Sequence, residues 1–269
     1  MNSPALEIIL PVRRDGAELA ATTASLIAQT DRRFTVLLSN LLPPDESVAP
    51  NESARKLAAA GIGVRRVRPP EELNTAEHWN WAHAQSTADW LKPLAPGERL
   101  NPGCVSALLA RIAEKPHARF IRCDAELVAG WGPEVLRAPF SQAAISPAQF
   151  VNHFPRRLDW ISRSVNVAYH RAAWRAAGGL SPQFKAFAAL NLNVILALHH
   201  GIENIGGPLA AADYTDDEPL NGAGGGRVNH CLELWLLLRQ ARNYCQSAKI
   251  PWPRGWLPAR TLFAILGRM

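Results

Sequence analysis

The sequence has few cysteines, no long hydrophobic run and no block of positive charge. Its four cysteines, none of them spaced as in metal or redox motifs, are Cys104, Cys123, Cys231 and Cys245. We therefore expect reduced thiols in a cytoplasmic protein. The most apolar runs, Leu232–Leu238 and Leu262–Leu266, are far shorter than the about 20 residues that a membrane crossing needs. No charged leader precedes the first apolar segment, so secretion is not expected.

Positive charge exceeds negative charge, but it is scattered along the chain. There are 29 Lys and Arg residues against 23 Asp and Glu residues, a net charge of +6, and the arginines run from Arg13 to Arg268. They do not form the Lys/Arg blocks with interleaved aromatic residues that line a nucleic-acid groove. We therefore expect no nucleic-acid partner. A basic balance of this kind suits a diphosphate or a phospholipid surface.

The first half of the chain alternates short apolar runs with segments of helical spacing. The expected strands are Leu6–Leu10, Phe34–Leu38, Val64–Val67, Trp90–Leu94 and Phe120–Cys123. The expected helices are Leu19–Gln29, a helix capped by Asn51 and ended by Gly61, a helix opened by the capping pair Asn74 and Glu77, and Val105–Ala113. This alternation predicts an α/β fold with a mostly parallel sheet flanked by helices.

The second half is less regular. Loops are expected at 131–149, a strand at Val165–Tyr169, a helix from Arg171 to the glycines Gly178 and Gly179, and helices at Leu192–His199 and Val228–Cys245. Apolar residues make up 48% of the chain, enough for one core with a small appendage. The expected division is a main domain at 1–220 and a C-terminal helix and amphipathic tail at 221–269.

The segment from Trp90 to Gly103 has the frame of a metal and sugar-nucleotide site. An apolar strand leads into a tight Pro-Gly turn, and a helix is expected to begin with Asn101 at the N-cap and Pro102 at the first helical position. This frame resembles the segment of family 2 glycosyltransferases in which aspartates after the strand hold a divalent cation. Two of those aspartates are replaced here by Ala95 and Gly97, and Glu98 alone keeps a carboxylate.

Further segments resemble the same family, in the family's order. They are Ile8–Val12, Ser25–Thr30, Val36–Asn40 with Asp45 and Ser47, Asn74–Ala82 and Val167–Gly179. Together they cover about residues 5–215. The resemblance implies the Rossmann-like GT-A fold, with a nucleotide-sugar donor beyond the carboxyl ends of the strands. Pro11, the 39–45 loop and the 95–99 loop would then surround one crevice.

The resemblance also assigns roles to individual residues. Donor binding falls to Pro11, Arg13, Arg14, Asn40, Lys92 and Arg99. The metal aspartates are missing, so no metal cofactor is expected, and Arg14 and Arg99 are metal substitutes because an arginine fork can neutralise phosphate oxygens. Asn191 marks the position where the family has an acidic general base. Glu98 is the nearby acid able to orient a sugar hydroxyl or act as a base.

Three functions remain open on the sequence. The first is an inverting, metal-independent glycosyltransferase acting on a lipid-linked or saccharide acceptor. The second is an inactive GT-A-fold protein that serves as a binding or partner subunit, with the charged residues as solvated surface. The third is nucleotidyl transfer, which would need a glycine-rich phosphate loop, whereas Pro11–Gly16 supplies one glycine. Self-association and a partner protein are both compatible with the sequence.

Other candidate residues have a structural interpretation beside a functional one. The adjacent His199 and His200 point about 100° apart on a helix, so they cannot chelate one ion together. The acidic loop with Asp213, Asp216, Asp217 and Glu218 is either solvated or cation-binding, and Trp79, Trp81 and Trp160 either pack in the core or stack on a ligand. The tail Pro251–Met269 is basic and contains tryptophans. It is expected to dock on its own domain, on a second subunit, or on the inner face of a membrane.

Overall fold

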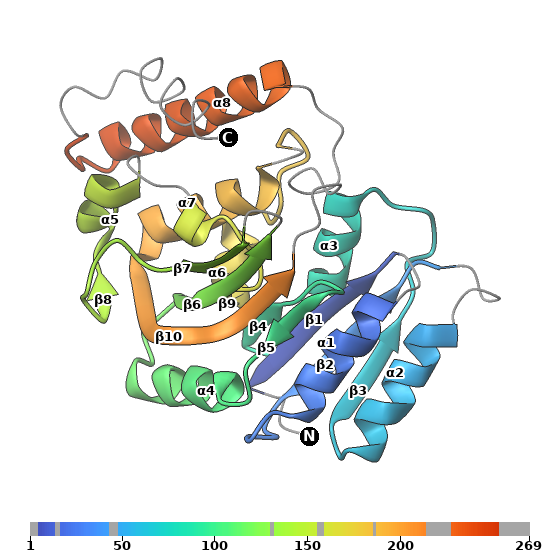
Figure 1. Cartoon of the computed structure of the whole chain (residues 1–269). Coiled ribbons are helices and arrows are strands. Elements are labelled where there is room, and N and C mark those ends of the chain that lie inside the picture. The colour runs from blue at the N-terminus through green and yellow to red at the C-terminus, as the bar shows by residue number, and fades with distance from the viewer. Residues whose placement is uncertain are drawn as a thin grey trace.

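The computed structural model describes residues 5–13, 17–42, 48–129, 132–154, 159–184, 187–213 and 227–252. These residues form one ten-stranded sheet with helices on both faces (Figure 1). The α/β class and the sheet flanked by helices are confirmed. Arg14, Asp45, Ser47, Asp216, Asp217, Glu218 and the tail beyond Trp252 lie outside the described residues, and the predictions made for them remain predictions.

The N-terminal half of the sheet is parallel, as the sequence predicts. Its strands are β1 (Leu6–Val12), β2 (Thr35–Asn40), β3 (Gly63–Val67) and β4 (Trp90–Pro93), in the order β3-β2-β1-β4. Every residue of β1 is buried, because helices cover both faces. Leucines of α1 (Ala17–Ile27) and α2 (Val48–Ala59) pack on one face, and Ala82 of α3 (Thr75–Ala84) packs on the other.

The C-terminal half of the sheet is mixed, which the sequence did not predict. Strand β9 (Val167–His170) pairs antiparallel with both β4 and β6 (Phe120–Ala129). Strand β10 (Ile202–Asp213) runs parallel to β6 and antiparallel to β5 (Glu98–Leu100). The segment expected to be loops contains β7 (Gly132–Leu136), β8 (Ala144–Ile145) and α5 (Pro147–His153). Strand β7 pairs with β6, and strand β8 pairs with β10.

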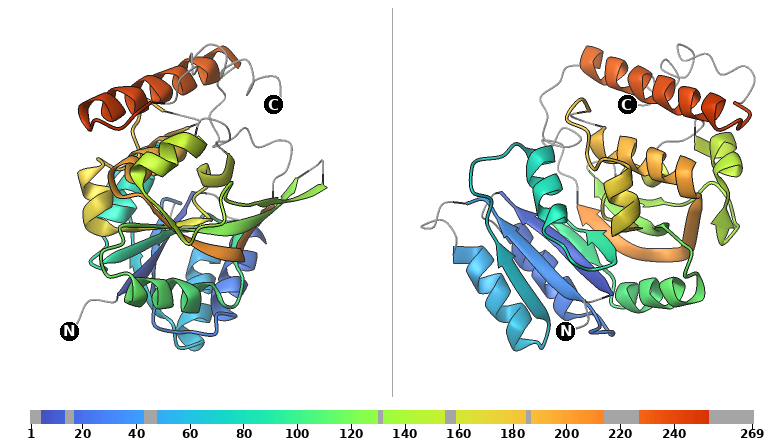
Figure 2. Two further views of the ribbon diagram at one scale, coloured as in Figure 1. Left: turned by 90° about the vertical axis from the view of Figure 1, so that its left-hand side faces the viewer. Right: turned by 180° about the vertical axis from the view of Figure 1, so that it is seen from behind.

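Helices cover both faces of this half of the sheet (Figure 1). Helix α4 (Cys104–Glu114) belongs to the same hydrophobic core as α1. The opposite face carries α5, the 3₁₀ turn η3 (Asp159–Ile161), α6 (Arg171–Ala176), α7 (Ala188–His200) and α8 (Arg227–Ser247). Leu234, Leu237 and Leu238 of α8 share a hydrophobic core with Val194 of α7. Figure 2 shows α8 lying across α7 on the outside of the molecule in both views. None of the described helices is long and apolar enough to span a bilayer.

Two expected helix starts are wrong, and two local signals are confirmed. Helix α2 begins at Val48, so Asn51 lies within it. Helix α4 begins at Cys104, because β5 and the turn after it occupy the residues where Asn101 and Pro102 were expected to open the helix. Asn74 and Glu77 form the predicted capping box, with both reciprocal hydrogen bonds present. Gly61 follows α2 with a φ of 77°, a left-handed conformation that suits glycine.

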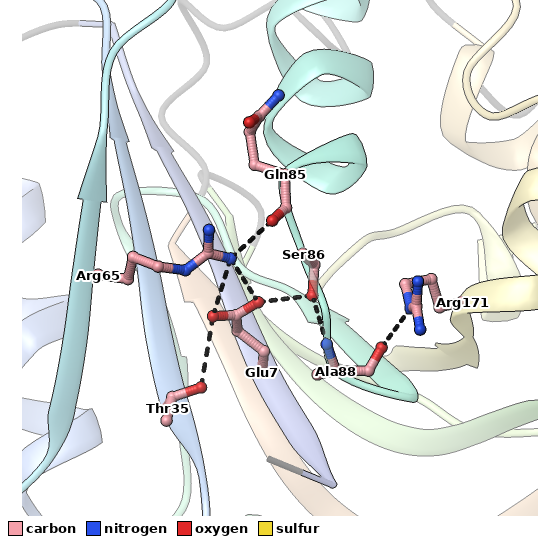
Figure 3. Close-up of polar contacts among 7 residues, drawn as sticks. All are labelled: Glu7, Thr35, Arg65, Gln85, Ser86, Ala88 and Arg171. Atoms are coloured by element: carbon pink, nitrogen blue, oxygen red, sulfur yellow. Dashed lines mark hydrogen bonds and ion pairs between the residues drawn. The ribbon is translucent and has the colours of Figure 1, made fainter. Parts of the chain in front are cut away.

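A buried carboxylate joins several elements at the amino-end edge of the sheet (Figure 3). Glu7 of β1 is 2% exposed and accepts hydrogen bonds from the Ser86 hydroxyl at 2.5 Å and the Thr35 hydroxyl at 3.4 Å. Arg65 of β3 approaches Glu7 at 3.3 Å and donates to the Gln85 carbonyl at 2.7 Å. Three strands and the end of α3 therefore meet at one charge.

Candidate nucleotide-sugar site

The carboxyl ends of β1, β2 and β4 lie together at the opposite edge. Pro11 is paired with Ser39, Val12 with Asn40, and Ile9 with Pro93. This register brings the predicted residues Pro11 and Asn40 side by side, with Arg13 directly after β1. The Asn40 side chain accepts a hydrogen bond from the Leu42 amide at 3.0 Å and so shapes the loop that follows β2.

The first turn of α3 lies against this edge. Arg13 is half-buried and donates to the Leu73 carbonyl at 2.6 Å, just before the helix. His78 of α3 is fully buried, and its Nε2 lies 2.7 Å from the Ser39 hydroxyl. Burial, with Arg13 nearby, lowers the pKa of His78 to about 4, so the ring is neutral at neutral pH. Sequence reasoning placed Ser39 in a crevice loop without a role and missed His78, although the capping pair had located the start of α3.

The side chain of Glu98 stabilises the turn from Ala95 to Glu98. Glu98 Oε2 accepts a hydrogen bond from the Ala95 amide at 2.7 Å, and Glu98 Oε1 accepts one from the Ser164 hydroxyl at 3.0 Å. Gly97 has a φ of 89°, and its amide donates to Thr22 Oγ1 at 3.0 Å. Glu98 is 8% exposed, and burial raises the pKa of its carboxyl. These contacts close the turn, and the acid or base role predicted for Glu98 stays a prediction.

Lys92 lies inside the protein and contacts main-chain oxygens. It is 1% exposed, and its ammonium donates to the carbonyls of Val165 at 2.7 Å, Pro93 at 3.1 Å and Ser164 at 3.3 Å. Burial lowers the pKa of this ammonium. The predicted donor-binding role does not fit these contacts, because the three carbonyls use the three donors of the ammonium.

Arg99 is paired across the sheet with Asp213 at the end of β10. Both guanidinium nitrogens of Arg99 reach the carboxylate, and the Nη2–Oδ1 distance is 2.7 Å. The hydrogen bond from Arg99 lowers the pKa of Asp213. A metal-substitute role for Arg99 would therefore require a phosphate to compete with Asp213.

Asn191, at the position of the missing general base, faces the C-terminal helix. It lies in the first turns of α7 and is 2% exposed, and its amide donates to Gln240 Oε1 of α8 at 2.9 Å. The residues before it in α7, Ala188, Ala189 and Leu190, carry no carboxylate. A neutral amide cannot accept a proton at neutral pH, so the catalytic role predicted at this position is not supplied by Asn191 itself.

The residues around the Ala95–Glu98 turn do not fit a divalent cation. The turn offers one carboxylate, Glu98, and both of its oxygens accept protein hydrogen bonds. Within the described ranges, no group of three or more His, Cys, Asp or Glu residues is placed to hold a metal ion. The rings of His199 and His200 are 6.0 Å apart and tilted by 44°, and His199 packs on Tyr244. Trp160 is fully buried in the core beside Phe140 and Phe150.

This arrangement is the GT-A glycosyltransferase fold, as comparison with solved structures shows. Residues 1–349 of TarS from S. aureus, in complex with UDP-GlcNAc, superpose with a TM-score of 0.69 and 14% identity over 87% of this chain and 66% of that fragment. The same fragment in complex with UDP gives a TM-score of 0.66 and 13% identity, over 87% of this chain and 64% of that one. The chain thus spans slightly less than two thirds of the TarS fragment.

A mannosyltransferase, PcManGT from Pyrobaculum calidifontis in complex with GDP-Man and Mn²⁺, has the same fold. It matches with a TM-score of 0.56 and 13% identity over 99% of this chain and 80% of its own. No protein-family profile matches the sequence, and no curated protein matches it. The likeness therefore lies in the fold.

Proposed function

We propose that this protein binds a nucleotide-sugar donor at the carboxyl ends of β1, β2 and β4 and transfers its sugar by inverting chemistry without a divalent cation. One observation carries this proposal. The strand-end edge places Pro11, Arg13 and Asn40 side by side, while the turn after β4 is closed by Glu98 with alanine and glycine in place of metal ligands. The solved relatives TarS and PcManGT hold UDP-GlcNAc and GDP-Man.

The proposed reaction has a simple balance of bonds. An acceptor hydroxyl oxygen attacks the anomeric carbon of the donor as the bond from that carbon to the β-phosphate oxygen breaks. The hydroxyl proton passes to a base, and the nucleoside diphosphate leaves with the electron pair. Arginine side chains neutralise the charge that grows on the diphosphate, a role open to Arg13 beside the Leu73 carbonyl. The base lies outside the family motif, because Asn191 is neutral and Glu98 closes the turn.

A second candidate function is donor binding without transfer, as a partner subunit. It is favoured by the contacts of the two predicted catalytic residues, since Asn191 is bonded to Gln240 and Glu98 to Ala95 and Ser164. An inactive protein keeps the scaffold and loses the acids. The two candidates share the donor site and differ in the acceptor step.

Calorimetric titration with UDP, GDP, dTDP and their common sugar conjugates tests the donor site. Each titration is run once with manganese and once with a chelator. We expect binding of at least one nucleotide that the chelator does not weaken. A ligand present at about 100 times its Kd stabilises the folded state by about 2.7 kcal/mol, so the same ligand raises the melting temperature.

The outcomes separate the candidates. Binding that requires manganese would overturn the metal-independent proposal, and the absence of binding by every nucleotide would overturn the donor site. Where a donor binds, its slow hydrolysis to nucleoside diphosphate and free sugar, followed by chromatography, supports the transferase. A bound donor that stays intact with saccharide and with lipid-linked acceptors supports the binding subunit.

The acceptor and location are part of the same proposal. We propose a lipid-linked or saccharide acceptor, with the C-terminal segment at the inner face of a membrane or at a second subunit. In the described part of that segment, the Arg239 guanidinium lies 5.2 Å from the Trp235 ring, and Leu232 is 56% exposed. Sedimentation with and without anionic vesicles distinguishes these locations.

A further inference from the structure

Strand β6 carries a carboxylate at the level of the turn that follows β4. Strand β9 pairs antiparallel with both β4 and β6, and its Tyr169 lies opposite both Leu91 and Phe120. Four residues toward the carboxyl end of each strand lie Ala95, in the turn, and Asp124, in β6. Since β4 and β6 are two strand spacings apart, these two positions are about 10 Å from each other. No sequence motif pointed to Asp124.

The Asp124 side chain lies on the face of the sheet that carries α7. Successive side chains of a strand point to opposite faces. Cys123 and Ala125 belong to the hydrophobic core that includes α4, whereas the Arg122 guanidinium lies 5.8 Å from the ring of Trp160, in the core that includes α7. Because Asp124 alternates with Cys123 and Ala125 in β6, its side chain projects to the same face as that of Arg122.

A buried arginine orients the Asp124 carboxylate through one of its two oxygens. Arg122 is fully buried, and it donates to Asp124 Oδ1 and to the Trp160 carbonyl, the latter at 3.1 Å. The Ala138 amide also donates to Oδ1, at 3.4 Å. Among the residues that the structure describes, none is hydrogen-bonded to Oδ2, and the Asp124 side chain keeps 13% of its surface exposed. The protein therefore holds one oxygen and leaves the other to a ligand.

We propose that Asp124 is the general base of the sugar transfer. Its Oδ2 accepts the proton of the acceptor hydroxyl while the hydroxyl oxygen bonds to the anomeric carbon and the bond from that carbon to the β-phosphate oxygen breaks. The nucleoside diphosphate leaves with the electron pair, and the proton passes from Asp124 to water afterwards. This inference rests on the proposed function, because it needs a nucleotide sugar bound at the strand-end edge.

The position of Asp124 suits this role better than those of the two residues predicted from the sequence. A base lies about 3 Å from the oxygen that it deprotonates, so about 7 Å of the distance to the turn remains for the sugar ring and its phosphate. Both oxygens of Glu98 accept protein hydrogen bonds, and Asn191 is a neutral amide bonded to Gln240.

The Asp124→Asn variant separates donor binding from donor cleavage. The amide keeps an oxygen for the Arg122 hydrogen bond, so calorimetry should give the wild-type Kd for the nucleotide sugar that the wild type binds. Hydrolysis of that donor to nucleoside diphosphate and free sugar should slow by about 100-fold or more. Asp89→Asn is the matched control and should keep the wild-type rate. It removes the same charge 3.9 Å from Arg171, directly before β4 at the amino-end edge.

Sodium azide distinguishes a lost base from a distorted site. Azide has no proton to lose, so its nitrogen attacks the anomeric carbon without a base, while the bond to the β-phosphate oxygen breaks as before. Azide should therefore restore release of nucleoside diphosphate in Asp124→Asn and give the glycosyl azide of inverted anomeric configuration, which NMR identifies. A residue with a structural role alone would show no such rescue.

The outcomes distinguish this inference from the proposed function. No binding of any nucleotide sugar by the wild type overturns both. A donor that the wild type binds and leaves intact, with saccharide and with lipid-linked acceptors, supports the binding subunit and overturns the role of Asp124. Hydrolysis at the wild-type rate in Asp124→Asn overturns that role alone. A loss of hydrolysis that azide does not restore also overturns it, because azide needs no base.

Discussion

At the scale of single residues, the two glycines after α6 differ in the space around them. Gly178 and Gly179 have φ values of 82° and 69°, so both occupy the left-handed region. A Cβ on Gly178 would meet nothing within 4 Å, whereas one on Gly179 would lie 2.5 Å from Asn80 Oδ1 and 3.0 Å from the Trp174 ring. The Asn80 side chain is held in this position by hydrogen bonds, each of 2.8 Å, to the amide and the carbonyl of Leu180.

Alanine substitutions should separate backbone strain from close packing. Gly178→Ala should lower the free energy of unfolding by about 1–2 kcal/mol, the cost of a left-handed alanine. Gly179→Ala should lose about 1–3 kcal/mol more, because the new methyl group overlaps Asn80. Urea denaturation measures both. An equal decrease in the free energy of unfolding for the two variants would show that the overlap of the new methyl group with Asn80 has no energetic cost.

The residue scale also shows what the sequence could and could not reveal about the site. Pro11, Arg13 and Asn40 were assigned to the donor from the family resemblance, and the pairing of β1 with β2 brings Pro11 and Asn40 to one edge of the sheet. The partners of Lys92 and Arg99 are more than 70 residues away in the chain, at Ser164, Val165 and Asp213. Local patterns carry no information on such contacts, so the sequence alone assigned both cations to the ligand.

At the scale of elements, α3 is a helix whose start was predicted correctly. Asn74 accepts from the Glu77 amide at 3.0 Å, and Glu77 accepts from the Asn74 amide at 2.9 Å. Asn74→Ala should therefore lower the free energy of unfolding by about 1 kcal/mol. The capping box of α5, where Ser146 and Gln149 bond in the same way, provides a matched comparison. Ser146→Ala should cost a similar amount, and an unchanged urea midpoint for Asn74→Ala would contradict the prediction.

Elements with weak or mixed patterns were the ones missed. Strand β10 contains Gly206, Gly207 and Pro208, and its pairing with β6 shifts register on both sides of Pro208. Glycine and proline are poor strand residues, so a twelve-residue strand was not expected there. Strand β5 has three residues, two of them charged, and it exists because Ala210–Ala212 of β10 pair with it. Long-range pairing, which propensity does not describe, determines both strands.

At the scale of the whole molecule, two buried histidines of α3 couple stability to pH. Burial lowers the pKa of both His78 and His83 to about 4 from 6.5, and His83 is held by the Trp79 carbonyl and the Tyr169 hydroxyl, each at 2.7 Å. In the unfolded chain these rings take up protons near pH 6.5. The folded state is therefore fully stable above about pH 6.5 and loses stability as the pH falls toward 4, by about 3 kcal/mol per histidine.

The slope of stability against pH provides the test. Urea denaturation between pH 7 and pH 4 should show a steep loss for the wild type. The His83→Gln variant should show a shallower loss, by about one proton's contribution over that range, since the carboxylates titrate alike in both proteins. The same slope in the two proteins would mean that His83 is protonated in the folded state.

The network around Glu7 has a consequence for how such a protein changes over generations. It joins β1, β2, β3 and the end of α3 at the edge of the sheet opposite the proposed donor site. Mutations in the loops at the other edge do not change these contacts. Selection therefore acts on them through what the loops bind and much less through the stability of the fold. A scaffold that is held together at one edge can lose acidic residues from the loops at the other edge and still fold, so the binding chemistry of those loops can change without a change of architecture.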